Sequence, residues 1–301
     1  MNRSHGQSPS WWSERLPCSL FLPPEKKEIM TPQEKFNATR RELSAALIER
    51  DEEIDLVLTA LVAQQHVLLV GPPGTGKSLL SDAIVEWMDG AKFSILLNKF
   101  TTPEETVGPI SLIGLKSDEY RRVVDGYLPT AHVAFIDEIW KASSAILNTL
   151  LKLLNERVFT NGTEVIRCPL RLCVAASNEW PSSEDGKELT ALFDRFLFRR
   201  SVRPISTETG RDRLLFDDRI GKPRLSTKST PEDIDQAHRE ASVLPWSEDA
   251  KDALRSILHE ARREGIQPGD RRMRESVKSA RAYAWLNGAS LRIGPARGRG
   301  Y

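Results

Sequence analysis

The segment His66–Ser78, which reads HVLLVGPPGTGKS, decides the fold expected for this chain. Its first five residues form a short apolar run that is typical of a strand buried in a parallel sheet. The rest, Gly71–Ser78, fits the pattern G-x-x-x-x-G-K-[ST], which joins such a strand to a helix. We therefore predict a strand, a phosphate-binding loop and a helix that extends to about Met88.

The loop Gly71–Ser78 has the chemistry needed to hold the triphosphate of ATP. A glycine-permitted loop at a helix N-terminus presents several backbone N–H groups to phosphate oxygens at once. We expect Lys77 to add a positive charge on the β and γ phosphates and the hydroxyl of Ser78 to ligate Mg²⁺. The residues expected to contact the nucleotide here are Gly71, Pro72, Pro73, Gly74, Thr75, Gly76, Lys77, Ser78 and Leu79. The alternative, a chance glycine turn, is disfavoured by the strand and helix around it.

A second apolar run, VAFIDE at Val133–Glu138, ends in two carboxylates. Strand residues place Asp137 at the carboxyl end of the sheet beside the phosphate loop, where it can hold Mg²⁺ through water. Glu138 can accept a proton from the attacking water as general base. The alternative is a polar strand end that caps the helix from Ser143.

Further apolar runs at residues 93–97 and 172–176 alternate with helical patterns. Such alternation indicates an α/β fold, with a parallel sheet covered by helices on both faces. We therefore predict the αβα sandwich of a P-loop NTPase. Two helices are expected before the first strand, one opened by a capping box at Thr31 and one starting at Asp51.

Two other patterns complete the expected organisation. The segments 110–124 and 158–167 are predicted to be hairpins, the second turning at Asn161-Gly162. After Pro204 the patterns are helical alone, with helices opened at Thr230, Ser247 and Asp270.

The predicted division is a poorly ordered extension over 1–30, a nucleotide-binding core over 31–204, an α-helical lid over 205–288 and a disordered tail over 289–301.

Composition excludes several classes of protein. The 301 residues carry 43 basic and 42 acidic side chains, and this total charge of +1 does not indicate a nucleic-acid partner or a membrane surface. Three cysteines without a CxxC pair disfavour a disulfide framework and a zinc site, and they indicate a cytoplasmic protein. No apolar stretch approaches the roughly 18 residues that span a bilayer.

With the two phosphate-site motifs in place, the chain resembles the AAA+ ATPases, and more narrowly the MoxR family. Three further segments carry the likeness and are similar to its RavA branch: TPEETVGP at 102–109, DEIWKA at 137–142 and AILNTLLKLLNE at 145–156. The resemblance extends from about Thr31 to Asn287. It implies Mg²⁺-dependent ATP hydrolysis in a homo-oligomeric ring, expected to be a hexamer. It also implies chaperone-like remodelling or maturation of a client protein, with a von Willebrand factor A domain protein as a partner.

The resemblance implies roles for three more residues. Asn178, at the end of a strand, matches the polar sensor 1 residue that orients the lytic water. Arg195 matches the arginine finger that acts on the nucleotide of the neighbouring subunit, although an ion pair with Asp194 or another nearby acid is an alternative. Arg271 matches the sensor 2 arginine of the lid, with Arg272 as a competitor and a plain basic helix face as the alternative.

The chain departs from the family pattern at its end, where ASLRIGPARGRGY at 289–301 stands in place of a further lid helix. We therefore expect a shortened lid and no additional partner-binding module. Three other functions stay open: a nucleotide-gated binding subunit with little turnover, a chelatase-type or DNA-acting motor, and a small-molecule P-loop kinase. Intact Glu138 and Arg195 argue against the first, and DEIWKA argues against the second. The third has no use for a trans arginine.

Overall fold

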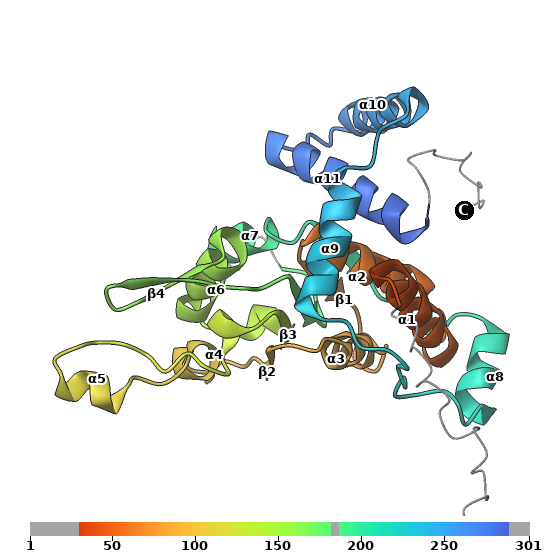
Figure 1. Ribbon diagram of the computed structural model, residues 1–301. Helices are drawn as coiled ribbons and strands as arrows, with labels where there is room; N and C mark the ends of the chain where they lie inside the picture. Colours follow the sequence, from red (N-terminus) through yellow and green to blue (C-terminus); the bar gives the residue numbers. More distant parts are fainter. Residues whose placement is uncertain (1–29, 182–186, 289–301) are drawn as a thin grey trace, which may run out of the picture. The chain divides into compact units, whose positions relative to one another are not determined.

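A five-stranded parallel sheet forms the centre of the chain and confirms the α/β prediction (Figure 1). The computed structural model describes residues 30–181 and 187–288, so the expectations for the two ends of the chain fall outside it, apart from Met30. The strand order is β2-β3-β6-β1-β7. The strands are β1 (Val67–Val70), β2 (Lys92–Leu96), β3 (Val133–Asp137), β6 (Leu172–Ser177) and β7 (Phe198–Ser201).

The register of the sheet brings the ends of three strands together. Val70 pairs with Ser177, and Leu96 pairs with Asp137. Because all neighbouring strands in this sheet are parallel, the segments that follow β1, β3 and β6 leave from the same edge. The predicted phosphate loop, the two carboxylates and Asn178 are therefore neighbours in space.

Hydrophobic side chains alternate between the two faces of the sheet. Val67 and Leu69 belong to one core cluster, whereas Leu68 and Val70 belong to the other. Helices α1 (Pro32–Ala46), α2 (Asp51–Ala63) and α3 (Lys77–Trp87) contribute to the first cluster, and α6 (Ser144–Glu156) to the second. This is the layered arrangement expected of an αβα sandwich.

The capping box predicted at Thr31 is present. The Thr31 hydroxyl accepts from the backbone N–H of Glu34, and the Glu34 carboxylate accepts from the backbone N–H of Thr31 at 2.8 Å. Two of the otherwise unpaired donors at the start of α1 are satisfied in this way.

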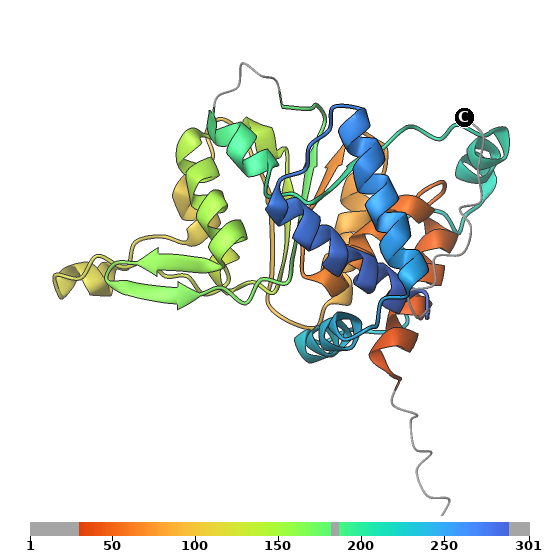
Figure 2. The ribbon, with the colours of Figure 1, turned by 90° about the horizontal axis from the view of Figure 1, so that it is seen from above.

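The region after Pro204 is helical, as predicted. Its helices are α8 (Glu208–Phe216), α9 (Pro231–Ser242), α10 (Glu248–Arg263) and α11 (Asp270–Leu286). Ile234 of α9 and Trp285 of α11 belong to the same core cluster as Val57 of α2. Figure 2 shows α9 and α11 beside the helices of the first layer. The division into core and lid at residue 204 stays a prediction.

The prediction of a hairpin over 110–124 was wrong. The segment contains the short helix α5 (Leu112–Lys116) and a single antiparallel bridge between Ile110 and Arg122. The Ser111 side chain accepts a hydrogen bond from the backbone N–H of Gly114, which starts a helical turn where a strand was expected.

The second predicted hairpin exists, as β4 (Val158–Asn161) and β5 (Glu164–Arg167). Its turn lies one residue later than predicted, because Asn161 pairs with Glu164 and Gly162 has the positive φ of 63°. The Asn161 side chain instead bonds the backbone of Arg122, so this hairpin and the α5 segment are joined. Figures 1 and 2 both show them at the same end of the sheet.

Several short elements had no clear pattern in the sequence. They are β7, α4 (Pro103–Val107), α7 (Lys187–Phe193), α8 and two 3₁₀ turns at Leu128–Thr130 and Ile139–Lys141. The strand β7 was missed because it is an edge strand that contains two arginines, Arg199 and Arg200, and therefore lacks a continuous apolar run.

Candidate functional site

The loop after β1 is held against the sheet in a form that requires glycine. The backbone N–H of Gly71 donates to the carbonyl of Ser177 at 3.1 Å, and a Cβ at residue 71 would lie 2.1 Å from the carbonyl oxygen of Val202. Gly74 and Gly76 have φ angles of 76° and 82°, a region that favours glycine. The loop therefore has the left-handed turns and the helix start at Lys77 that the motif predicts.

The ammonium group of Lys77 lies inside this loop. Its Nζ donates to the carbonyl oxygens of Gly71 at 2.6 Å and Pro72 at 2.9 Å, and to Oδ1 of Asn178 at 3.1 Å. Burial lowers the pKa of Lys77 below its ordinary value, and the carboxylates of Asp137 and Glu138 oppose that shift. These contacts hold a positive charge where the motif predicts phosphate.

The two carboxylates at the end of β3 face different partners. Asp137 accepts a hydrogen bond from the Ser78 hydroxyl at 3.2 Å through Oδ2, and its Oδ1 accepts from the backbone N–H of Glu138 at 2.9 Å. Glu138 has a left-handed backbone with φ of 53°, which is uncommon for a residue with a side chain. Its carboxylate forms an ion pair with Lys141 at 3.3 Å.

Neither carboxylate caps the helix that follows, since the first residues of α6 have Ser143 as N-cap and no side-chain cap bond is present there. Among the described residues, Asp137 and Glu138 therefore do not form a cap for α6, which was the alternative interpretation.

Asn178 connects the phosphate loop to the carboxylates at the end of β3. Its Oδ1 accepts from Lys77, and its Nδ2 donates to Oε1 of Glu138. The predicted residues Lys77, Ser78, Asp137, Glu138 and Asn178 are therefore brought together by hydrogen bonds from three strand ends.

The oxygen atoms at this site fit a magnesium ion. Ser78 Oγ and Asp137 Oδ2 lie 3.2 Å apart, and one hydroxyl with one carboxylate is the donor set that Mg²⁺ uses together with water and substrate phosphates. Among the residues the structure describes, no group of three or more His, Cys, Asp or Glu side chains could hold a metal. The Ser78–Asp137 pair suits an ion whose other ligands are water and the phosphates of a nucleotide.

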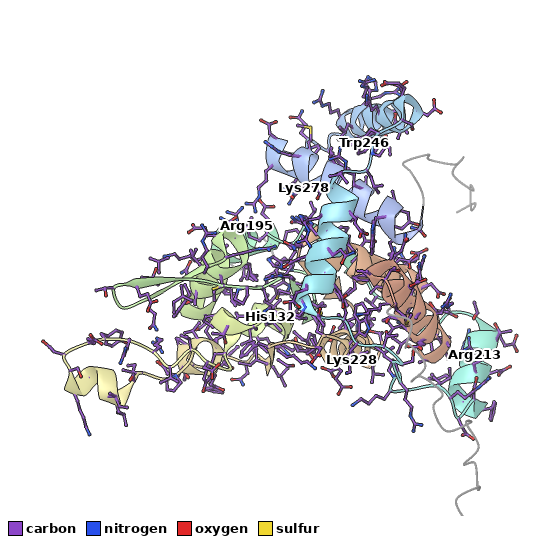
Figure 3. All side chains as sticks on the ribbon, in the orientation of Figure 1. His132, Arg195, Arg213, Lys228, Trp246 and Lys278 are labelled. Atoms are coloured by element: carbon purple, nitrogen blue, oxygen red, sulfur yellow. The ribbon has the colours of Figure 1, made fainter. Side chains whose placement is uncertain are left out.

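Arg195 lies in the turn between α7 and β7 (Figure 3). It precedes Phe198, which pairs with Val67 at the start of β1, whereas the phosphate loop follows the end of β1. In the described part of the chain, its guanidinium has no hydrogen bond or ion pair, and its Nε is buried without a partner. The alternative ion pair with Asp194 is therefore absent, and Asp194 instead pairs with Arg272 and Arg199.

Arg271 and Arg272 differ in their surroundings. Arg272 reaches Asp194, so it ties the start of α11 to the turn that carries Arg195. Arg271 is exposed at the first turn of α11, and within residues 30–181 and 187–288 it has no hydrogen bond or ion pair. Among the residues that the structure describes, neither arginine has a hydrogen bond or ion pair to the chain's own phosphate loop, and the sensor 2 role of Arg271 stays a prediction.

Sequence reasoning missed Arg50, which holds the phosphate loop through a hydrogen bond to the loop backbone. This buried arginine donates from Nε to the carbonyl of Thr75 at 2.8 Å and from Nη2 to the carbonyl of Arg203 at 2.8 Å. It lines a cavity of about 490 Å³ beside β7. No motif marks it, because its role depends on two carbonyl groups that are distant in the chain.

Glu49, next to Arg50, was also missed. Its carboxylate accepts hydrogen bonds from the backbone N–H groups of Ser206 at 2.8 Å and Thr207 at 2.9 Å, and from both hydroxyls. The bonds from Thr207 and Ser206 lower the pKa of Glu49 to about 2. Glu49 thereby fixes the segment that leads from β7 into α8.

Comparisons with known proteins show which proteins this chain is similar to. A family model described as the MoxR domain of MoxR-vWA-beta-propeller ternary systems matches residues 34–235. Two uncharacterized proteins of Methanocaldococcus jannaschii, MJ0812 and MJ0079, are 41% and 39% identical over 250 and 266 residues. These matches cover 83% and 87% of this chain but 65% and 67% of the relatives, so the chain spans about two thirds of their length.

Two more distant matches are a curated MoxR protein and a solved structure with a similar fold. Protein MoxR of Methylorubrum extorquens is 25% identical over 280 residues, which cover 82% of this chain and 79% of that protein. The crystal structure of a candidate ATPase from Cytophaga hutchinsonii superimposes with a TM-score of 0.66 at 17% identity, covering 86% of this chain and 82% of the other. At that identity the likeness shows the fold.

The matched model does not specify the RavA-like branch, which stays a prediction. Among the described residues, no helix has the length and apolar character needed to cross a membrane.

Proposed function

The chain belongs to the MoxR family, and from this premise we propose that it hydrolyses ATP with Mg²⁺ in a ring of identical subunits. The observation that carries the proposal is the bonded set of Lys77, Asn178 and Glu138 beside the Ser78–Asp137 pair. Such a set combines phosphate binding, a place for a metal and a carboxylate base, which are the parts that ATP hydrolysis needs.

Each side chain has a distinct task in this proposal. Lys77 exchanges its carbonyl partners for the β and γ phosphates, which it attracts as a positive charge. Ser78 and Asp137 would hold Mg²⁺, which would neutralise the charge that develops on the phosphate. Glu138 takes the proton of the attacking water, and Asn178, which bonds Glu138 in this structure, orients that water once nucleotide is bound.

In this proposal the two hydrogen bonds of Asn178 keep Glu138 inactive until ATP binds. In this structure Lys77 holds Oδ1 of Asn178, whose other end holds Glu138. When phosphate draws Lys77 away, Asn178 is released to turn toward the γ phosphate and Glu138 is freed to accept a proton. The proposal therefore links nucleotide occupancy to the activation of water.

Arg195 acts in trans in this proposal. Arg195 precedes β7, whose first residue pairs with the first residue of β1. The chain's own phosphate loop follows the opposite end of β1. An unpaired guanidinium on this side is suited to stabilise charge on a nucleotide bound by a neighbouring copy. A ring, which we propose to be a hexamer, supplies such a neighbour for every subunit.

Hydrolysis in such a ring is proposed to remodel or mature client proteins in the cytoplasm. The family description places related MoxR domains in systems with a von Willebrand factor A protein and a β-propeller, which supports a von Willebrand factor A partner for this chain. Its balanced charge favours protein clients over nucleic acid.

Steady-state ATP hydrolysis measured against protein concentration tests the proposal. We compare the wild type, Glu138→Gln, Arg195→Ala and the control Arg255→Ala, whose arginine lies exposed on α10. Specific activity should rise with concentration in the wild type and the control. It should be lost in Glu138→Gln, and in Arg195→Ala it should fall about a thousandfold or more, to a residual rate. Activity independent of concentration that survives Arg195→Ala would contradict the shared site. A salt-dependent affinity for DNA would favour a DNA-acting motor instead.

A further inference from the structure

Three aromatic side chains lie beside the three loops that carry the proposed catalytic groups. Trp140 follows Glu138 by two residues, Trp180 follows Asn178 by two, and Phe193 precedes Arg195 by two. The Phe193 ring lies 6.2 Å from the Trp180 ring at 80° and 6.3 Å from the Trp140 ring at 55°. The side chain at the end of α7 therefore touches both loops of the chain's own site.

Phe193 is also held by Arg199 of β7. The Arg199 guanidinium lies 3.8 Å from the centre of its ring, and Arg199 Nε donates to the carbonyl of Phe196 at 2.8 Å. Arg199 and Arg272 both pair with Asp194, the residue after Phe193. Burial and the nearby Arg272 lower the pKa of Arg199 to about 10, so this arginine stays charged at neutral pH.

The geometry of these rings makes the contact directional. Edge-to-face and tilted aromatic pairs have preferred orientations, so a rotation of the Phe193 ring changes its fit to Trp140 and Trp180 together. The Nε1 of Trp140 is buried without a hydrogen bond, so ring packing holds this indole in place. Trp140 lies in the 3₁₀ turn that contains Lys141, the ion-pair partner of Glu138.

We propose that Phe193 is a positioning residue that couples the Arg195 turn, which serves the neighbouring subunit's nucleotide, to the Glu138–Asn178 pair of the chain's own site. This inference rests on the proposed function. A shift of Asn178 and Glu138 on nucleotide binding moves Trp180 and Trp140, and Phe193 passes that movement to the turn two residues away. Occupancy of one site thereby sets the position of the arginine at the next.

A double-mutant cycle on ATP turnover tests this coupling. Phe193→Leu should lower kcat about tenfold with KM within about twofold, because a small misplacement of a distant catalytic group costs between ten- and a hundredfold. In an Arg195→Ala background it should have no further effect, since both changes remove the same interaction. Phe193→Tyr, which keeps the ring, should restore turnover. The control Phe159→Leu removes an aromatic from the same core and should leave kcat unchanged.

Equal losses from Phe193→Leu in both backgrounds, or equal losses from Phe159→Leu, would overturn the coupling, because general damage to the core adds independently of Arg195.

Tryptophan emission gives a readout that needs no turnover. A non-hydrolysable ATP analogue should change the emission of the wild type, and Trp180→Phe should remove most of that change. Trp246→Phe should retain it, since Trp246 packs with Ala250 and Ala284 near α10 (Figure 3). Phe193→Leu should reduce the change at saturating analogue, and a full response in that variant would overturn the proposal. A wild type that binds the analogue without hydrolysing ATP would contradict the proposed function alone, and the emission comparison would still decide the coupling.

Discussion

Nδ2 of Asn178 donates a hydrogen bond to Oε1 of Glu138, although the two residues lie 40 positions apart in the chain. The same amide accepts from Lys77 through Oδ1, so one side chain joins the phosphate-binding lysine to the proposed base. This bridge is the feature of the site that is most open to a direct test.

Asn178→Ala should lower kcat by roughly a hundred- to a thousandfold, the usual loss when one oriented donor is removed from a reacting centre. ATP binding should change little, because the loop and Lys77 remain. Turnover and the affinity for a fluorescent ATP analogue are measured together. Asn148→Ala, at an exposed position on α6, is the control. A variant that loses affinity and retains kcat would show that Asn178 serves in binding.

Gly71→Ala should destabilise the chain even without nucleotide. A Cβ at this residue would lie 2.1 Å from the carbonyl oxygen of Val202, so β1 and β7 must shift, at a cost of about 3 kcal/mol. Gly74→Ala meets nothing within 4 Å and should cost only the about 1–2 kcal/mol of a left-handed backbone. Urea unfolding of the two variants measures the difference, and equal destabilisation would contradict the packing argument.

Glu49→Gln should release the segment that leads into α8. The variant retains a polar side chain but loses the negative charge that accepts from Ser206 and Thr207. Trypsin should then cut after Arg211 and Arg213 faster than in the wild type, while Glu260→Gln on α10 should leave the rate unchanged. A rate equal to that of the wild type would show that this tie does not hold the segment.

The same carboxylate predicts a pH dependence. Its folded pKa of about 2 is below the ordinary value of 4.5, so its contribution is fully present above pH 4.5 and is lost as the pH falls through about 2. Cleavage of the wild-type segment by pepsin, which works in acid, should therefore accelerate progressively as the pH falls from about 4.5 to about 2. A rate of cleavage that does not change over this range would contradict the depressed pKa.

His66 predicts a second pH effect on stability. Its Nδ1 accepts from the backbone N–H of Cys173 at 3.1 Å, so the ring is neutral and its Nε2 donates to the carbonyl of Leu154. Burial lowers its pKa from 6.5 to about 3. Between these values the unfolded chain binds a proton that the folded chain does not, so the free energy of unfolding falls as the pH falls below 6.5.

The slope from this one group approaches about 1.4 kcal/mol per pH unit. His66→Gln removes the titrating ring and should show a correspondingly shallower fall between about pH 4 and 6.5 in urea unfolding. Parallel curves for the variant and the wild type would mean that His66 is protonated in the folded chain.

Much of the fold could be predicted because its signals are local. The apolar run 67–70, the glycines after it and the capping box at Thr31 each depend on residues close in sequence. The strand β7 and the helix α5 could not be predicted in this way. Two arginines in an edge strand and apolar residues in an exposed helix contradict the usual patterns, and neighbouring segments decide their conformation.

The site divides along the same line. The sequence by itself determined the residue types of the phosphate loop, the carboxylates of Asp137 and Glu138, and the parallel sheet that must gather them at one edge, because motif spacing and strand polarity are properties of the chain. Only the tertiary structure decided that Asn178 bridges Lys77 to Glu138 and that Arg50 bonds the backbone of the phosphate loop. These contacts join atoms from segments far apart in sequence, and their geometry exists only once the strands have paired and the helices have packed.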